Sequence, residues 1–258
     1  MSIVIKDLNF VYSPKSPFEK HALVDVNLTV EEGDFLAIIG HTGSGKSTFV
    51  QHLNGLVKLQ KGSIIVDGID LGQKKIDFKK LRSTVGMVFQ YPEYQLFADT
   101  VYDDVAFGPK NLKLSKEEID IRVKEAIKLV GLDFDYVNQK SPFELSGGQK
   151  RRVAIAGVIA TNPSVLILDE PAAGLDPAGR EKLLLELHRI RKENGTTIIL
   201  ISHSMEDLAQ NAERIILLNK GEKYKDNNAK DVFTDGALLE KCGLQVPEIT
   251  QLLKFLND

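Results

Sequence analysis

The stretch Gly40-His41-Thr42-Gly43-Ser44-Gly45-Lys46-Ser47 decides how the rest of this chain is interpreted. It fits the phosphate-binding pattern G-x-x-x-x-G-K-[ST], and it lies between an apolar run at residues 35–39 and a helix-permissive segment at residues 48–56. That strand, loop and helix context is what the motif requires. The glycines allow backbone N–H groups to surround an anion, and the start of the following helix adds a partial positive charge.

Two side chains at the end of this stretch have expected roles. Lys46 is expected to reach the β- and γ-phosphates of a nucleotide, and the Ser47 hydroxyl is expected to ligate Mg²⁺. The alternative is a glycine-rich turn that matches the pattern by chance. The remainder of the chain decides between these readings and shows what the nucleotide is for.

Composition describes an ordinary globular protein. The chain has 258 residues, 43% of them hydrophobic, and a formal net charge of -3. This charge gives no global basic field, which weakens a role on nucleic acid without excluding it. A single cysteine, Cys242, rules out an intramolecular disulfide, suits a reducing compartment and is expected to be a packed thiol. No apolar run approaches the roughly 20 residues that span a bilayer, so membrane association is expected through a partner.

Two half-exposed strands are expected before the phosphate loop. Residues 3–12 and 22–30 partly alternate between apolar and polar side chains, as strands of an antiparallel sheet do. Residues 13–17 form the loop between them, and Tyr12 stands at its entrance. A tyrosine at a strand end commonly packs, but beside a phosphate loop its ring could stack on adenine. Both readings stay open.

Further strands and a helical insertion follow the phosphate loop. Residues 62–68 and 85–89 are strand candidates, and the second runs directly into Gln90 and a loop of polar and aromatic residues. After this loop, which ends at residue 97, the pattern is helical to about residue 162. One buried face, opened by a capping box of Ser115 and Glu118, is made by Ile119, Val123, Ile127 and Val130. We therefore expect a helical subdomain inserted in an α/β core.

The core resumes at residues 165–168, four consecutive apolar residues followed by Asp169 and Glu170. Such a run is typical of a strand covered on both faces in a parallel sheet, and the carboxyl ends of these strands are where such sheets bind ligands. A helix at about 179–194 and a buried strand at 197–202 are expected next, and the strand ends at His203. Residues 214–218 and the segment after residue 222 suggest a closing hairpin.

The carboxyl-terminal segment, residues 225–258, differs in character. It starts with a polar stretch and continues with short helical patterns around residues 231–233 and 238–239. Pro247 could open a last helix. Its apolar stripe would consist of Ile249, Leu252, Leu253 and Leu256. The stripe either packs on its own chain, which is the usual case, or forms a dimer contact.

A second anion site is indicated by Leu145-Ser146-Gly147-Gly148-Gln149. Ser146 is a good amino-terminal cap for the helix that follows, and the glycines leave backbone N–H groups open. Taken alone, this is only another capped helix. Two helix starts suited to phosphate in one chain require a geometric explanation.

A resemblance to the ATP-binding cassette (ABC) ATPases supplies that explanation. The stretch at residues 145–149 matches their signature letter for letter, and the other motifs occur in family order. These are the phosphate loop, Gln90 of the Q-loop, Asp169-Glu170 closing the Walker B strand, Ala173-Gly174-Leu175-Asp176 as the D-loop, and His203 as the switch histidine. The resemblance covers residues 2–224. It implies an α/β P-loop NTPase core with a mostly parallel sheet, an amino-terminal antiparallel sheet, a helical subdomain at about 91–162 and a small carboxyl-terminal helical region at 225–258.

The resemblance also implies a head-to-tail dimer, in which the phosphate loop of one subunit and the signature of the other enclose each ATP. Glu170 would act as the general base, while His203 would contact the γ-phosphate and Gln90 would sense Mg²⁺ and the lytic water. The implied ATP-binding residues are Tyr12, Gly40, His41, Thr42, Gly43, Ser44, Gly45, Lys46, Ser47 and Thr48, the last through the α-phosphate. Those that act on the partner's ATP are Leu145, Ser146, Gly147, Gly148 and Gln149, and those that hold Mg²⁺ are Ser47, Gln90 and, through water, Asp169.

A narrower resemblance is to the ATPases of energy-coupling factor (ECF) transporters. Residues 90–97, Gln90-Tyr91-Pro92-Glu93-Tyr94-Gln95-Leu96-Phe97, are similar to their Q-N-P-E-D-Q-L-F stretch and depart from it at the two tyrosines. Residues 107–112, His41-Thr42 and Ala172-Ala173 also resemble this family, the last two pairs its second ATPase type. The segment at 225–258 has the length of the ECF dimerisation region.

The ECF resemblance implies several partners and a place in the cell. The partners are a second, paralogous ATPase, a transmembrane coupling (T) subunit and a substrate-binding membrane (S) subunit, with a vitamin or transition-metal ion as cargo and a position on the cytoplasmic side of the cell membrane. A homodimer stays open. The favoured function is thus a transport ATPase driven by dimer closure.

Two other function classes are weighed against it. A soluble ABC ATPase of DNA repair or translation would usually have two cassettes, coiled-coil insertions or a basic surface, and none is evident. A catalytically silent nucleotide-binding regulator is disfavoured because Lys46, Glu170 and His203 occur together.

Overall fold

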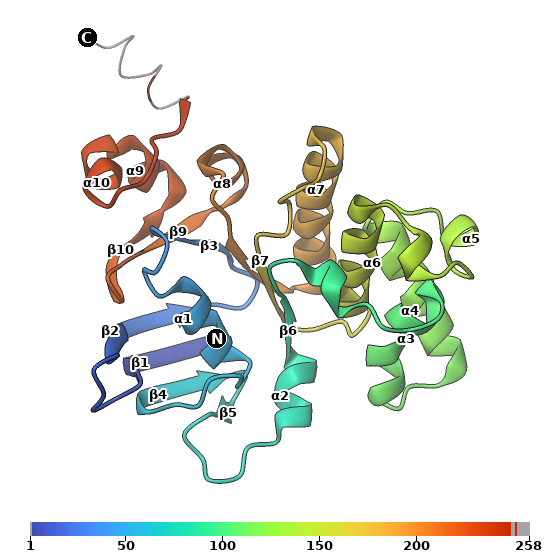
Figure 1. Ribbon diagram of the computed structural model, residues 1–258, viewed down its shortest axis with the longest axis horizontal. Coiled ribbons are helices and arrows are strands. Elements are labelled where there is room, and N and C mark those ends of the chain that lie inside the picture. The colour runs from blue at the N-terminus through green and yellow to red at the C-terminus, as the bar shows by residue number, and fades with distance from the viewer. Residues whose placement is uncertain (1, 249–250, 252–258) are drawn as a thin grey trace. The chain divides into compact units, whose positions relative to one another are not determined.

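The computed structural model describes residues 2–248 and 251, and it divides into two compact α/β units (Figure 1). The first unit combines residues 1–82 with residues 197–258, and the second comprises residues 83–196. The first unit therefore contains the phosphate loop and the predicted switch histidine. The second contains the predicted Q-loop, signature, Walker B and D-loop residues.

An antiparallel sheet forms the amino-terminal part of the first unit. Its strand order is β2-β1-β4-β5, with β1 at Ile3–Tyr12, β2 at Lys20–Val30, β4 at Lys61–Val66 and β5 at Ile69–Asp70. Strand β1 pairs antiparallel with both β2 and β4. The alternating pattern thus correctly predicts an antiparallel sheet, and β5 is an addition to it.

A second group of strands in this unit has the order β10-β9-β3-β8. Strand β3 (Phe35–Ile39) runs parallel to β8 (Thr197–Ile201) and β9 (Arg214–Asn219), and β10 (Glu222–Asn228) closes the predicted antiparallel hairpin with β9. Every residue of β3 and β8 is buried, as their uninterrupted apolar sequences predict. Because β3 and β8 are parallel, the segments that follow them leave the same edge of the sheet.

Helices complete the first unit. Helix α1 (Lys46–Leu53) follows the phosphate loop, α8 (Met205–Asn211) follows β8, and α9 (Ala229–Thr234) and α10 (Gly236–Lys241) confirm the short helical patterns predicted near the carboxyl end. Helix α2 (Phe78–Thr84) runs into the second unit. Cys242, after α10, is buried as predicted, and this burial raises the pKa of its thiol. The apolar stripe Ile249, Leu252, Leu253 and Leu256 lies outside the described residues.

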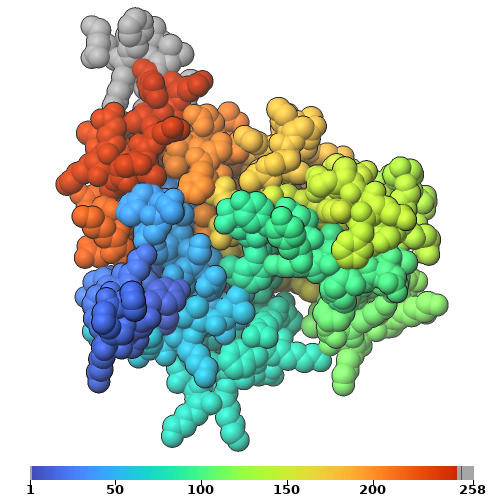
Figure 2. All heavy atoms as spheres, viewed as in Figure 1, coloured from blue at the N-terminus to red at the C-terminus, as the bar shows by residue number. Residues whose placement is uncertain are grey.

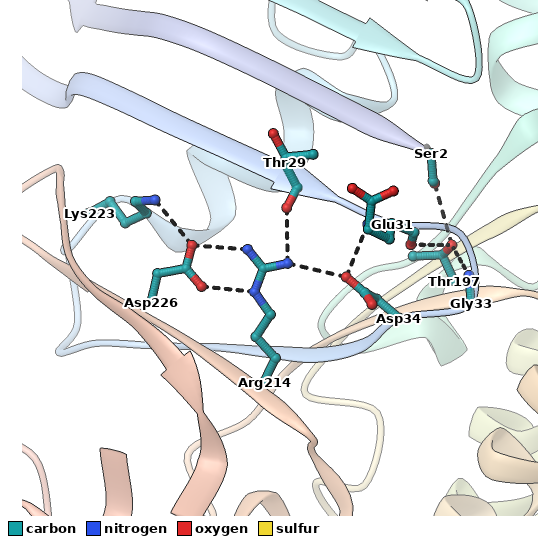
Figure 3. Close-up of polar contacts among 9 residues, drawn as sticks. All are labelled: Ser2, Thr29, Glu31, Gly33, Asp34, Thr197, Arg214, Lys223 and Asp226. Atoms are coloured by element: carbon teal, nitrogen blue, oxygen red, sulfur yellow. Dashed lines mark hydrogen bonds and ion pairs between the residues drawn. The ribbon is translucent and has the colours of Figure 1, made fainter. Parts of the chain in front are cut away.

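The polar stretch at residues 225–228 is part of β10, and Asp226 within it is paired with Arg214 of the neighbouring strand β9 (Figure 3). Arg214 donates two hydrogen bonds to Asp226, of 2.8 and 3.0 Å, and a third of 3.2 Å to Asp34 before β3. Lys223 adds a bond of 3.1 Å to Asp226. Burial works against the charge of Asp226, but the bonds from Arg214 and Lys223 outweigh it and lower the pKa of that carboxyl. The network ties the hairpin to the strand that carries the phosphate loop.

The second unit holds a parallel pair of strands and the predicted helical insertion. Strand β6 (Val85–Val88) pairs with β7 (Val165–Asp169). Between them lie η1 (Pro92–Gln95), α3 (Val101–Asn111), α4 (Lys116–Leu129), α5 (Phe134–Val137), η2 (Pro142–Glu144) and α6 (Gly147–Ile159), and α7 (Pro177–Asn194) follows β7. The predicted capping box opens α4, with Glu118 N donating to Ser115 Oγ at 3.2 Å. Green and yellow-green atoms of this segment reach the surface in Figure 2.

Candidate functional site

The phosphate loop connects β3 to α1 through three glycines with positive φ. The φ angles are 153° at Gly40, 82° at Gly43 and 106° at Gly45. A Cβ on Gly45 would lie 2.5 Å from Ala22 O of strand β2, and one on Gly40 would collide with Leu218 O of β9. Glycine is therefore required twice over, for its backbone conformation and for the close approach of neighbouring strands.

Lys46 lies inside this loop. Its side chain is buried, and Nζ donates to Gly40 O at 2.6 Å and to His41 O at 3.1 Å. These carbonyls satisfy a desolvated ammonium and hold its positive charge at the centre of the loop. Ser47, the next residue, is exposed at the start of α1. The side chains that the motif assigns to phosphate and magnesium are thus adjacent at one helix start.

A small cavity of about 120 Å³ opens beside the loop. It is lined by Tyr12, Lys20, Ala22, Gly43, Gly45, Lys46, Ser47 and Thr48. The Tyr12 hydroxyl lies 3.1 Å from Thr48 Oγ1, and the tyrosine is 41% exposed, so the ring is anchored at its polar end. Lys20 is a cation that sequence reasoning missed. Its only sequence signal is its place at the start of β2, which does not reveal that the strand passes the phosphate loop.

His203 follows β8 and is exposed. Since β3 and β8 are parallel neighbours, with Ile38 paired to Ile201, His203 and the phosphate loop leave the same edge of the sheet. The first unit therefore brings together the predicted residues for adenine, for the phosphates and for sensing the γ-phosphate.

The second unit gathers the predicted catalytic residues in the same way. Val88 pairs with Leu168 in the parallel β6–β7 ladder, so Gln90 and the acidic pair Asp169-Glu170 emerge at one edge. Gln90 is exposed, Asp169 is half-buried and Glu170 is buried. The backbone of Glu170 has φ 54°, the left-handed region that is costly for a residue with a side chain.

Arg151 of α6 holds the backbone at this point, and sequence reasoning missed that role. Its Nε donates to Pro171 O at 2.9 Å, and its Nη2 donates to Glu170 O. Its Nη1 lies 3.9 Å from Glu93 Oε2 in η1. Because two of the three partners are backbone carbonyls, the sequence offers no signal for them beyond a buried position on a predicted helix.

The signature forms a capped helix start, as predicted. Gln149 N donates to Ser146 Oγ at 3.3 Å, and Ser146 N donates to Gln149 Oε1 at 3.0 Å, which completes a capping box. A Cβ on Gly147 would meet nothing within 4 Å, so packing inside this chain does not require glycine there. Asp176 of the predicted D-loop caps α7 by accepting from Gly179 N at 3.2 Å. The signature helix start is thus exposed and ordered.

Four exposed aromatic side chains lie in the loop after Gln90 and in the helix α3 that follows it. This aromatic patch consists of Tyr91, Tyr94, Phe97 and Phe107, which are 52%, 84%, 60% and 50% exposed. Phe97 and Phe107 meet edge to face with ring centroids 4.9 Å apart. Tyr91 and Tyr94 form a second pair, with ring centroids 6.1 Å apart. Exposed aromatic side chains commonly mark an interaction surface.

Within residues 2–248 and 251, no group of three or more His, Cys, Asp or Glu side chains is arranged to hold a metal ion. The same part of the chain contains no helix long and apolar enough to cross a bilayer.

Comparisons with known proteins identify the family of the chain. Residues 23–173 match the ABC transporter family. The chain is 56% identical to the energy-coupling factor transporter ATP-binding protein EcfA2 of Clostridium perfringens and 55% identical to that of Clostridium tetani, and each alignment covers 100% of this chain and 90% of the relative.

Two solved structures are also similar. One is cbiO1 from Clostridium perfringens, described as part of the ABC transporter complex cbiONQ, with a TM-score of 0.80 and 39% identity over 98% of both chains. The other is the dimeric bacterial ABC transporter cassette MJ0796, with a TM-score of 0.78 and 32% identity over 88% of this chain and 98% of that one. The relatives favour the transport reading over the soluble ABC ATPase. The chain therefore belongs to the energy-coupling factor transporter ATP-binding proteins of the ABC transporter family, and it is the ATP-hydrolysing subunit of such a transporter.

Proposed function

We propose that this chain hydrolyses MgATP at composite sites, each shared between its phosphate loop and the signature of a second ATPase subunit, to drive uptake of a vitamin or transition-metal ion. The observation that carries the proposal is the pair of helix starts at α1 and α6. One holds the buried Lys46 and the other is capped by the exposed Ser146. A helix start favours an anion such as phosphate, and the first of these two helix starts also carries the Lys46 ammonium.

In this proposal the first unit binds the nucleotide. Lys46 holds the β- and γ-phosphates, Thr48 bonds the α-phosphate, and the ring of Tyr12 stacks on adenine. Lys20, which lines the same cavity, adds a second cation beside the nucleotide. His203 contacts the γ-phosphate from the neighbouring strand end.

The second unit supplies the hydrolytic groups. Glu170 accepts a proton from the attacking water as general base, and Gln90 orients that water. Glu170 is buried, so its carboxylate is shielded from bulk water. On the partner's ATP, Ser146 donates to the γ-phosphate, together with the N–H groups that Gly147 and Gly148 leave open.

The residues expected at the metal fit Mg²⁺. Ser47, Gln90 and Asp169 offer a hydroxyl, an amide oxygen and a carboxylate, which are the hard oxygen donors that this ion takes while keeping several waters. When bound, the ion would neutralise charge on the phosphates during hydrolysis. The chain's own contribution is to hold these oxygens at strand ends and at a helix start.

We further propose that the aromatic patch docks on a transmembrane coupling subunit, on the cytoplasmic side of the membrane. The coupling subunit acts together with a substrate-binding membrane subunit. The nearness of the patch to Gln90 in the sequence supports this role, because a push on the patch would reach the Q-loop directly. The second ATPase is a paralogue in the favoured arrangement, and a second copy of this chain in the other.

The test of the catalytic assignment is Glu170→Gln in the transporter complex reconstituted with its membrane subunits. ATP hydrolysis should fall at least about 100-fold, the usual lower range for loss of a general base, while ATP binding persists. Glu125→Gln on the exposed face of α4 is the matched control and should hydrolyse at the wild-type rate. Unchanged turnover by Glu170→Gln would remove Glu170 from this role.

The partners are tested by detergent extraction of the native complex and mass spectrometry of its subunits. Recovery of this chain with a second ATPase and two membrane proteins is the expected result. Recovery with ribosomes or DNA and no membrane subunit would contradict the transport assignment.

A further inference from the structure

Arg151 is a buried cation whose bonds all point toward functional segments of its own unit. It is 5% exposed, and burial of a guanidinium is costly unless its N–H groups are satisfied. Here Nε and Nη2 donate to Pro171 O at 2.9 Å and to Glu170 O, and Nη1 lies 3.9 Å from the Glu93 carboxylate, an ion pair without a hydrogen bond. The guanidinium therefore joins three segments, α6, η1 and the turn after β7.

The turn after β7 needs such a clamp because Glu170 is in the left-handed region. At φ 54° its backbone costs about 1–2 kcal/mol relative to an ordinary conformation, and such residues persist only where their surroundings fix them. By holding the carbonyls of Glu170 and Pro171, Arg151 fixes the two peptide groups that follow the Glu170 Cα. The direction in which the Glu170 side chain leaves the backbone depends on those peptide groups.

The third partner connects this clamp to the aromatic patch. Glu93 lies in η1, where it stands between the exposed Tyr91 and Tyr94 in the sequence, but its own side chain is only 22% exposed. Among the described residues its Oε2 has no hydrogen-bond partner, so at 3.9 Å it is attracted to Arg151 without a directional bond. A small displacement of η1 would lengthen or shorten this contact and so change the attraction that Glu93 exerts on the Arg151 guanidinium.

We propose that Arg151 is a positioning residue for ATP hydrolysis, which holds Glu170 in its left-handed conformation and transmits displacements of η1 to it through Glu93. This inference rests on the proposed role of Glu170 as general base. It extends that role, because it makes the rate of hydrolysis depend on what is docked at the aromatic patch.

The experiment uses the reconstituted transporter with Arg151→Met, Arg151→Lys and Glu93→Gln. Arg151→Met should lower kcat about 10- to 100-fold with the KM for ATP within about twofold, because misplacing a catalytic group by about 1 Å costs up to about 100-fold in rate. Arg151→Lys should fall between Arg151→Met and wild type, since one ammonium cannot bond both carbonyls and still pair with Glu93. Arg122→Met is the matched control, because Arg122 also donates to a carbonyl, Thr161 O at 3.1 Å, but does so away from the turn after β7.

Glu93→Gln tests transmission. It should reduce the stimulation of hydrolysis by the membrane subunits about threefold or more, and it should affect hydrolysis by the isolated ATPase pair less. A merely structural arginine would not produce this split, nor would it change kcat without KM. Thermal unfolding of every variant separates a loss of folded protein from a loss of rate.

The outcomes distinguish this inference from the proposed base. In a Glu170→Gln background, Arg151→Met should add no further loss of hydrolysis, because both act through the same carboxylate. If Glu170→Gln is inactive but Arg151→Met matches Arg122→Met, the inference is overturned and the base stands. If Glu170→Gln hydrolyses normally, the base itself fails. Where Arg151→Met does not fold, wild-type kcat in Arg151→Lys together with wild-type stimulation in Glu93→Gln overturns the inference.

Discussion

Replacing Gly45 by alanine should destabilise the protein more than the same replacement at a glycine that has a positive φ but no close neighbour. At φ 106° the alanine would carry a backbone penalty of about 1–2 kcal/mol. Its Cβ would lie 2.5 Å from Ala22 O and 3.2 Å from Leu23 Cδ2, and the first contact forces the β2 backbone to move. Overpacking of this kind costs about 1–3 kcal/mol. We therefore expect the free energy of unfolding to fall by about 2–5 kcal/mol.

Two glycines of the same unit separate these contributions. Gly68, in the turn after β4, has φ 76° and would meet nothing within 4 Å, so Gly68→Ala should cost only the backbone penalty of about 1–2 kcal/mol. Gly43 has φ 82° within the phosphate loop, and its nearest neighbour would be Lys20 Nζ at 3.8 Å. Gly43→Ala should therefore lose about as much stability as Gly68→Ala.

The assay is urea unfolding of the full chain, with and without ATP. The shift that ATP produces reports its affinity for the folded state. Gly45→Ala should lose most of this shift because its loop N–H groups are displaced, whereas Gly68→Ala should keep all of it. Equal destabilisation by Gly45→Ala and Gly68→Ala would refute the argument that close approach of β2 requires glycine at position 45.

Two further predictions concern a helix cap and a buried histidine. Ser146→Ala should lower stability by about 1 kcal/mol through loss of the cap, whereas Ser146→Asp should keep the cap but hydrolyse ATP at least about tenfold more slowly in the assembled dimer, as measured by thermal unfolding and phosphate release. Burial lowers the pKa of His52 despite its contact with Thr48 O, so the unfolded chain binds more protons and stability should fall as the pH drops below about 6.5. Urea unfolding between pH 7.5 and 5 should show a weaker pH dependence for His52→Phe, and an unchanged slope would contradict the assignment.

Local signals in the sequence were sufficient for most of the fold. Some elements depend only on residues that are close together in the sequence, so the sequence predicts them. They are the apolar strand β3, the glycine-containing phosphate loop and the capping boxes at Ser115 and Ser146. Strand β10 is the contrast. Its polar residues lack an apolar period, because Asp226 is stabilised by Arg214 on the neighbouring strand and not by hydrophobic burial.

The candidate site likewise contains residues that the sequence predicts and residues that it does not. Its motif residues were predicted by number, and the structure places them at strand ends and helix starts. Arg151 and Lys20 were not assigned a role, since one bonds backbone carbonyls and the other meets the loop only through the path of β2. Every residue has a backbone carbonyl, so the sequence does not show which carbonyl a side chain will bond. Which segments a strand passes is known only from the assembled sheet. Such positioning residues are therefore the part of a site that structure adds to sequence.

Ser146 shows why one residue can serve both the fold and the site. Serine, aspartate and asparagine are about equally good helix caps, so capping alone does not select serine. In the structure the Ser146 oxygen accepts from Gln149 N at 3.3 Å, which uses an acceptor position of the hydroxyl and leaves its proton to be donated. A phosphate oxygen is an acceptor, and an aspartate at this position could accept from Gln149 N but would have no proton to offer and would repel the anion. The cap and the proposed contact to the partner's γ-phosphate are thus compatible in serine and incompatible in aspartate, and for this reason Ser146→Asp separates the two roles.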